Sequence, residues 1–252
     1  MIDLAGKHAL IAGGLGHVTQ GVAQTMAQAG AVITTARDTG DPAQGWPDAH
    51  ALSFDDPVML REQLRALDPF DVVIISPAAI FYKLFLDTTD ADWDRAISDN
   101  FERAVWTAQA AAHTLIERQR PGSIIFLSSV AAQMPFAHMS ALGASLGALR
   151  ALAKMAAVDL APHDITVNVI ECGWTEHEAN QPYLSPEGRT HVEAGTPTGR
   201  IVTAEEIGHA CCFLASDLAR SITGAILTID GGYTLTRSDG ASALSGVDIP
   251  GG

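Results

Sequence analysis

The chain has few cysteines, and their positions match no redox or metal-binding motif. Three occur in 252 residues, Cys172 and the adjacent pair Cys211 and Cys212. None is spaced as in CxxC, and consecutive cysteines rarely bridge each other. No His/Cys spacing is diagnostic of zinc either. We therefore expect no disulfide framework and no metal site, as is typical of a reducing compartment.

Basic residues are also scarce. Lys and Arg number 15 against 29 Asp and Glu, which gives a formal net charge of −14. A negative surface repels nucleic acid and anionic membranes, so neither is expected as a partner. The segment MIDLAGKHALIAGG lacks the pattern of a signal peptide, and no apolar run reaches the roughly 18 residues that span a bilayer. We expect a cytoplasmic protein.

Apolar residues make up 47% of the chain, enough for one large core. Short strand-like runs alternate with alanine-rich segments of helical period, a pattern typical of βαβ units. It predicts an α/β fold, a single-domain doubly wound parallel sheet of Rossmann-like type, over residues 1–233. Residues 234–252 have little apolar content and are expected to form a poorly ordered tail or an arm on a neighbouring subunit. The runs are HALIAGG, AVITTAR, DVVIISPAA, GSIIFLSS, TVNVIECG and AILTIDGG.

A glycine-rich turn, AGGLGHVTQG at 12–21, follows the first predicted strand and leads into a helix. Such a turn lets backbone N–H groups approach a pyrophosphate at the positive end of the helix dipole. Arg37 stands at the end of the second strand, where it can pair with a 2′-phosphate. Together these features predict NADP(H) binding, with NADP favoured over NAD. The alternative is that the glycines only permit a tight turn and Arg37 is a solvated surface charge.

From LAGKHALIAGG at residue 4 to ILTIDGGY at residue 233, the chain resembles the short-chain dehydrogenase/reductase family. Further matching stretches are DWDRAISDN, GSIIFLSSVAA and the segment beginning TPTGRIVTAEEIG. The resemblance implies a Rossmann-like fold, oxidoreductase activity and a homotetramer that pairs helices at roughly 94–117 and 141–161. It also places Ser129 at the catalytic serine and Asn100 at the helix asparagine.

The same resemblance implies a set of cofactor contacts. By position they are Gly13, Gly14, Leu15, Gly16, His17, Val18, Arg37, Ser53, Phe54, Pro77, Ala78, Gly173 and Thr175. Several of these positions depart from the family pattern. His17 and Thr19 replace two glycines, Ser53 replaces the aspartate that faces adenine, and Cys172 replaces a proline. Side chains thus stand where backbone normally approaches the cofactor, and His17 either hydrogen-bonds a phosphate or blocks the site.

The family's acid–base pair is missing. A tyrosine thirteen residues after the serine and a lysine one helical turn later are replaced by Leu142 and Leu146, in the gap-free match LGASLGAL. Tyr82, Tyr183 and Tyr233 are the only tyrosines, and none has a lysine four residues on. A leucine has no titratable proton, so the ordinary reductase route lacks its acid.

The segment after the sixth predicted strand carries residues that could act instead. Glu171, Cys172, Glu176, His177, Glu178 and Tyr183 gather where this fold opens its cleft. We take His177, Glu176, Tyr183 and Cys172 as catalytic candidates beside Ser129 and Asn100. Each also has a structural interpretation, as a solvated carboxylate, a small buried thiol, or a serine or asparagine that satisfies backbone groups. An apolar substrate pocket is predicted from Met134, Met139, Leu142, Leu146 and Trp174, unless the leucines fill it.

The run VIECGWTEHEANQPYLSPE at 169–187 is similar to a loop of halohydrin dehalogenases, relatives that gave up the dinucleotide and carry out non-redox elimination. Three functions therefore stay open. The first is an atypical NADP-linked oxidoreductase acting on an apolar small molecule. The second is a non-redox lyase, isomerase or cyclase, and the third is a catalytically silent binding or assembly subunit.

Overall fold

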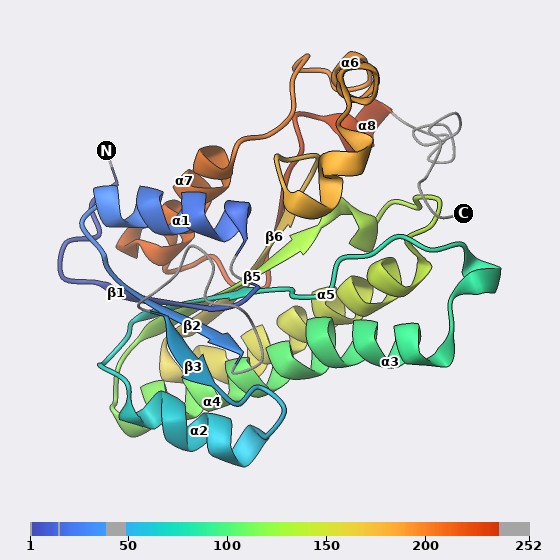
Figure 1. Cartoon of the computed structure of the whole chain (residues 1–252). Helices are drawn as coiled ribbons and strands as arrows, with labels where there is room; N and C mark the ends of the chain where they lie inside the picture. Colours follow the sequence, from blue (N-terminus) through green and yellow to red (C-terminus); the bar gives the residue numbers. More distant parts are fainter. Residues whose placement is uncertain (1, 15, 39–48, 237–252) are drawn as a thin grey trace.

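A computed structural model describes residues 2–14, 16–38 and 49–236, and its centre is a seven-stranded parallel sheet (Figure 1). The strand order β3-β2-β1-β4-β5-β6-β7 confirms the predicted doubly wound α/β class. The strands are β1 (His8–Gly13), β2 (Val32–Asp38), β3 (His50–Leu52), β4 (Val72–Ser76), β5 (Gly122–Ser129), β6 (Ile165–Cys172) and β7 (Ile226–Ile229). The three-residue edge strand β3 was not among the predicted runs.

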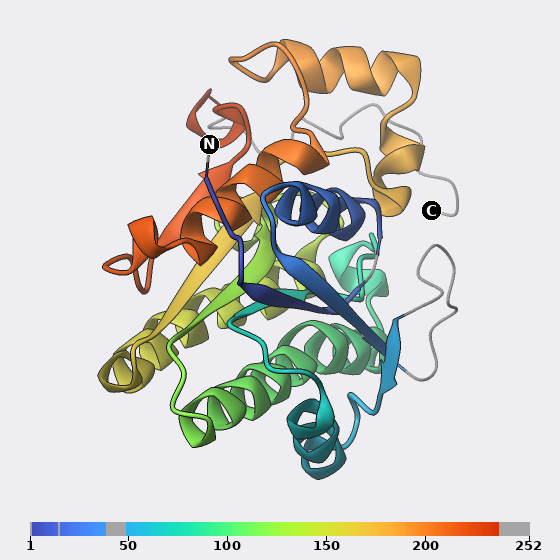
Figure 2. The same ribbon diagram turned by 90° about the vertical axis from the view of Figure 1, so that its left-hand side faces the viewer.

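Helices cover both faces of the sheet, as Figures 1 and 2 show. On one side lie α1 (His17–Gln28) and α7 (Ala204–Ala215), and on the other α2 (Pro57–Ala66), α4 (Arg103–Glu117) and α5 (Ser140–Leu160). α3 (Asp90–Ile97) runs into α4 through a π-helical turn at Ser98–Glu102. α6 (Pro186–Ala194) and α8 (Tyr233–Thr236) lie beyond the carboxyl ends of β6 and β7. The predicted boundary at residue 233 stays a prediction, since 237–252 lie outside the described residues.

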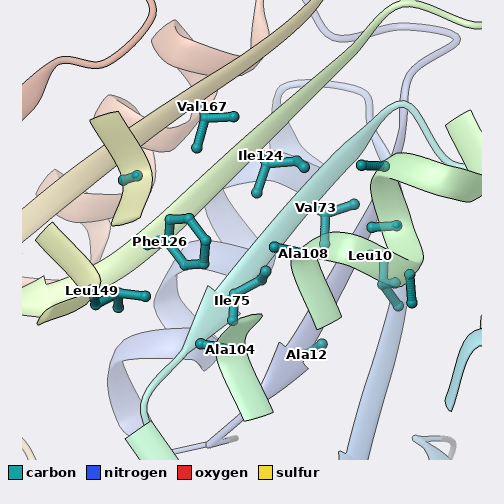
Figure 3. Close-up of a cluster of buried hydrophobic side chains, with 14 of the residues drawn as sticks. Leu10, Ala12, Val73, Ile75, Ala104, Ala108, Ile124, Phe126, Leu149 and Val167 are labelled. Carbon is teal, nitrogen blue, oxygen red and sulfur yellow. The ribbon is translucent and has the colours of Figure 1, made fainter. Parts of the chain in front are cut away.

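The central strands read as continuous apolar runs because they are buried on both faces. Successive side chains alternate, so β4 sends Val73 and Ile75 toward α4 and α5, and Val72 and Ile74 toward α1 and α7. Figure 3 shows the first of these clusters, in which Phe126 of β5 lies between sheet and helices. Burial of each such side chain contributes about 1.5–3 kcal/mol, which holds the strand ends in fixed positions.

Helix α5 is the longest helix of the described chain, with 21 residues. Its first turn approaches the short helix η3 (Val130–Ala132) so closely that a Cβ on Gly143 would lie 2.9 Å from the carbonyl oxygen of Ala131. This contact fixes the start of α5 beside the end of β5. The segment Ser140–His163 is also long and apolar enough to cross a membrane by length and composition, but a core helix passes the same test, and α5 buries seven of its residues.

The sheet order reverses direction between β1 and β4. β1 pairs with β2 on one side and with β4 on the other, and all of these strands end at the same edge. In open α/β sheets, ligands bind in the crevice outside this switch point. The fold therefore directs attention to the loops that follow β1, β4, β5 and β6.

Candidate active site

A cleft of about 860 Å³, open solvent included, lies at this edge. Its walls come from the β1–α1 turn, the segments after β4, β5 and β6, and the start of α5. None of the described residues that line it is an Asp, Glu, Lys or Arg. The lining residues are Gly14, Gly16, Val18, Thr19, Ser76, Pro77, Ile80, Tyr82, Leu127, Ser128, Ser129, Val130, Phe136, Met139, Leu142, Leu146, Cys172, Gly173, Trp174, Thr175, His177 and Asn180.

The glycine turn packs against the segment after β4. Gly13 has φ +102°, and a Cβ there would lie 2.2 Å from the carbonyl oxygen of Ser76. A Cβ on Gly14 would lie 2.3 Å from the carbonyl oxygen of Pro77. Both positions must therefore be glycine. Within the described chain, Gly16 caps α1 without a side-chain hydrogen bond and no acidic residue stands in the first turn, so the positive helix end faces the cleft.

The two residues that replace family glycines leave the cleft open. Thr19 is buried, and its hydroxyl donates to the carbonyl oxygens of Gly16 (2.8 Å) and Gly14 (3.2 Å). The threonine thus braces the turn from inside. His17 is exposed on α1 and is not among the lining residues. Leu15 lies outside the described residues.

A second, smaller cavity of about 310 Å³ adjoins the glycine turn on the α4 side. Phe54 and Ala78 give it apolar walls, while Arg103 of α4 gives it charge. Arg103 is paired with Asp38 (2.9 Å), Asp55 (2.6 Å) and Asp99 (3.2 Å), and its side chain is only 19% exposed. We call these four residues the Arg103 cluster. This cluster was not among the sites predicted from the sequence, where the only signal for it is the spacing of Asp99 and Arg103 by one helical turn.

These features fit a dinucleotide. The open helix end and glycine turn suit a pyrophosphate, and the small cavity offers an apolar slot for a base. Arg37 is half-buried at the end of β2, where one Nη donates to the Asp38 carbonyl oxygen at 3.1 Å. Arg37 lines neither the cleft nor the small cavity. Ser53 lines neither cavity, and its N–H donates to Gln63 Oε1 at 2.9 Å.

Ser129 and the two leucines, which the family resemblance singled out, all line the cleft. Ser129 ends β5, and its Oγ accepts the N–H of Ala131 at 3.2 Å, an arrangement that leaves the hydroxyl proton available to a ligand. Leu142 and Leu146 of α5 line the same cleft and are 4% and 1% exposed. The leucines line the cavity without filling it.

The segment after β6 divides between the cleft and the surface. Cys172, Trp174, Thr175 and His177 line the cleft. Burial, and then the charge of Glu171, raise the pKa of the Cys172 thiol to about 12, so it stays protonated at neutral pH. Such a thiol behaves as a small hydrophobe rather than a nucleophile.

Two other candidates lie away from the cleft. Glu176 is 45% exposed and forms an ion pair with Arg189 of α6. Tyr183 is buried behind the cleft wall, with its ring 4.5 Å from that of Tyr82 and 6.5 Å from that of Trp174. Burial raises the pKa of Tyr183. The side chain of Glu178 lies outside the described part of the structure.

Glu171 is fully buried beside the floor of the cleft. It faces α5, where its Oε1 lies 3.2 Å from the Nε of Arg150, and it does not line the cavity. Burial raises the pKa of Glu171, and the charge of Arg150 offsets part of this effect.

Asn100 acts as a brace. Its side chain is fully buried in the π-helical turn, accepts the N–H of Ala79 (2.9 Å) and donates to the Ala79 carbonyl (2.8 Å) and to Ser145 Oγ (3.3 Å). These bonds tie the segment after β4 to α5, and Asn100 does not line the cleft. Met139 does line it, whereas Met134 packs in the aromatic cluster with Trp174 and Tyr183.

Tyr82 lines the cleft but was not among the site residues predicted from the sequence. Its hydroxyl donates to Asn180 Oδ1 at 2.7 Å, and Asn180 Nδ2 donates in turn to the Thr175 carbonyl at 3.0 Å. Burial, and then the neighbouring Tyr183, raise the pKa of this phenol above its usual range. The only signal in the sequence was an aromatic run, IFYKLF, soon after β4.

Comparison with known proteins agrees with this architecture. A family model described as Enoyl-(Acyl carrier protein) reductase matches residues 59–234. The L-xylulose reductase of Bos taurus is 29% identical over 242 residues, covering 93% of this chain and 99% of the relative. The 3-oxoacyl-(acyl-carrier-protein) reductase of Escherichia coli (strain K12) is 28% identical over 242 residues, with 92% and 98% covered.

Solved structures give the same result. A short-chain type dehydrogenase/reductase from Mycobacterium marinum has a TM-score of 0.81 and 28% identity, with 92% of this chain and 97% of that chain covered. An Agrobacterium tumefaciens protein assigned as a 2-deoxy-D-gluconate 3-dehydrogenase, solved with bound NADP, has a TM-score of 0.83 and 25% identity, with 93% and 98% covered. The chain belongs to the short-chain dehydrogenase/reductase family.

Proposed function

We propose that this protein is an oxidoreductase that binds NADP(H) and acts on a small molecule in the apolar cleft by a non-standard proton transfer. One observation carries the proposal. The glycine turn and the open N-terminus of α1 face the same cleft as Ser129, so a cofactor and a substrate would meet beside that hydroxyl.

The residues that would hold the cofactor are those of the turn, the small cavity and Arg37. Gly13 and Gly14 keep the turn tight, Gly16 and Val18 present backbone N–H groups, and Arg37 offers a charge to the 2′-phosphate. When bound, the nicotinamide group supplies or accepts a hydride.

The chain's own task is to bind the carbonyl oxygen and move a proton. Ser129 donates its hydroxyl proton in a hydrogen bond to that oxygen. Among the described lining residues the titratable side chains are Tyr82, Cys172 and His177, and burial raises the pKa values of the first two. An imidazole can release a proton near neutral pH, so His177 is the proposed donor.

Leu142 and Leu146 favour a second candidate, a non-redox lyase, isomerase or cyclase in the same cleft. They remove the pair that ordinarily serves hydride transfer, while Ser129 and His177 can still polarise a carbonyl and move a proton. Turnover without any dinucleotide, lost in His177→Gln, would establish this candidate in place of the first.

Calorimetric titration with NADPH and NADH tests the main proposal. We expect NADPH to bind more tightly. Arg37→Ala should lower the preference for NADPH by roughly 1.5–3 kcal/mol, the value of a hydrogen bond to a charged group. Arg65→Ala is the matched control, since Arg65 pairs with Glu117 on the surface. Absence of binding by either dinucleotide at millimolar concentration would contradict the proposal.

A further inference from the structure

The hydrogen-bonding capacity of the cleft wall is largely used up by the protein itself. Tyr82 donates to Asn180, Asn180 donates to a backbone carbonyl, and the Thr19 hydroxyl is committed to the glycine turn. The Ser76 hydroxyl donates to the Pro77 carbonyl oxygen at 3.5 Å, and Cys172 offers only a weak thiol donor. These side chains therefore present few free donors to a ligand.

Two further polar atoms belong to lining residues but do not reach the cleft surface. Ser128 Oγ and Trp174 Nε1 are buried without a hydrogen-bond partner. Each has almost no accessible surface, so neither adds a donor to the wall in this arrangement. Ser129 differs, because its Oγ only accepts a bond and its proton is available. Two polar lining residues remain, and both already have a proposed role: Thr175 is among the predicted cofactor contacts, and His177 is the proposed proton donor to the same substrate oxygen.

Charge is lacking in the cleft as well. The described lining residues include no carboxylate, ammonium or guanidinium group, and the nearby charges are already paired, Glu171 with Arg150 and Glu176 with Arg189. Away from the helix end of α1, a charged ligand group would lose its hydration without gaining a partner, which is costly in an apolar site. A polyol would likewise leave most of its hydroxyls unpaired.

From this accounting we infer that the substrate is a neutral, predominantly hydrocarbon carbonyl compound with a single hydrogen-bond-accepting oxygen, held by Ser129. Leu142, Leu146, Met139, Phe136 and Trp174 contact its hydrocarbon part. The inference rests on the proposed function and adds the substrate class. It separates this chain from its relative named L-xylulose reductase, because a sugar has several hydroxyls to satisfy.

A ladder of methyl ketones from 2-hexanone to 2-decanone tests the inference on the wild-type chain, by calorimetry with and without saturating NADP⁺. We expect the affinity to rise about fourfold for each added methylene until the cleft is filled, the value of burying one CH₂. Decanoate and L-xylulose should bind at least 100-fold more weakly than 2-decanone. Equal or tighter binding of either would overturn the inference.

A ligand with a second acceptor oxygen tests the claim that the cleft holds only one such oxygen. 2,9-Decanedione should bind no more tightly than 2-decanone; tighter binding would show that Ser128 or Trp174 turns into the cleft, and would overturn the single-acceptor claim. Leu142→Gln should flatten the ladder to less than twofold per methylene. Leu152→Gln, on the same helix but outside the cleft, should leave it unchanged.

These results are distinguishable from those of the cofactor titration. A normal ladder without dinucleotide binding would support the substrate class while contradicting the oxidoreductase. NADPH binding, together with ketone affinities that do not change along the ladder in the wild type, would support the oxidoreductase and contradict the substrate class. Should Leu142→Gln fail to fold, the ladder and the diketone on the wild-type chain still decide the question.

Discussion

The two cavities at the carboxyl edge of the sheet share the glycine turn but have opposite character. The small cavity on the α4 side is lined by three members of the Arg103 cluster, Arg103, Asp38 and Asp99. The larger cleft on the α5 side contains no charged side chain among its described lining residues. Charges fix position and register, whereas an apolar wall selects by size and hydration. The small cavity thus combines apolar walls with fixed charges, whereas the larger cleft, away from the helix end of α1, offers mainly an apolar wall.

The largest effect is expected at the turn that joins both cavities. Gly13→Ala should lower the free energy of unfolding by about 3 kcal/mol or more, because the added Cβ meets the Ser76 carbonyl at 2.2 Å and φ is positive. Urea unfolding measures this. Gly147→Ala is the control, since its Cβ would find only the Ala132 carbonyl at 3.8 Å in the middle of α5. It should stabilise by up to about 1 kcal/mol. Equal changes in the free energy of unfolding for the two variants would contradict the close packing of the glycine turn against the end of β4.

Removal of the central charge tests the polar half. Arg103→Ala should destabilise the fold by about 2 kcal/mol, because it leaves Asp38, Asp55 and Asp99 close together without their shared cation. High salt should restore part of the loss. In Arg65→Ala, which breaks an exposed pair with Glu117, the change should stay below about 0.5 kcal/mol. A loss of stability of similar size in both variants would show that Arg103 contributes no more to stability than an exposed ion pair does.

The buried carboxylate under the apolar half gives a smaller, pH-dependent effect. Burial raises the pKa of Glu171, so the folded state favours the protonated form and stability falls as the pH rises above the ordinary carboxyl range. Glu171→Gln should remove this fall and stabilise the protein at pH 8 by about 1 kcal/mol. Thermal unfolding between pH 5 and 8 measures the trend, with Glu117→Gln as the surface control. If the stability of the wild-type protein rises over this pH range instead, the predicted direction of the pH dependence is wrong.

The smallest effect is expected when only the missing phenol is restored. Leu142→Tyr should give no measurable gain in ketone reduction with NADPH, since a phenol without a neighbouring lysine keeps its high pKa in an apolar wall. The double variant Leu142→Tyr/Leu146→Lys should show slow turnover. Activity in the single variant equal to that of the double would contradict the need for the lysine.

Much of this architecture could be predicted from the chain alone. The alternation of apolar runs and alanine-rich helices determines a doubly wound sheet because strands covered on both faces must be apolar throughout. The same local logic located the glycine turn, placed Ser129 at a strand end, and put Leu142 and Leu146 on one helical face. Each of these rests on residues close together in sequence, where spacing fixes geometry.

Only the tertiary structure decided which distant side chains meet. Tyr82 reaches Asn180 across 98 positions of the chain, and Arg103 reaches Asp55 across 48. Glu176 and Tyr183, which lie within three residues of lining residues in the sequence, turn instead to Arg189 and to the aromatic cluster. The path of a loop after a strand depends on packing against other elements, a long-range property that local periodicity does not encode. The sequence could therefore predict that leucines stand at positions 142 and 146 beside Ser129, while the shape of the cleft and its lack of charged side chains followed from the fold.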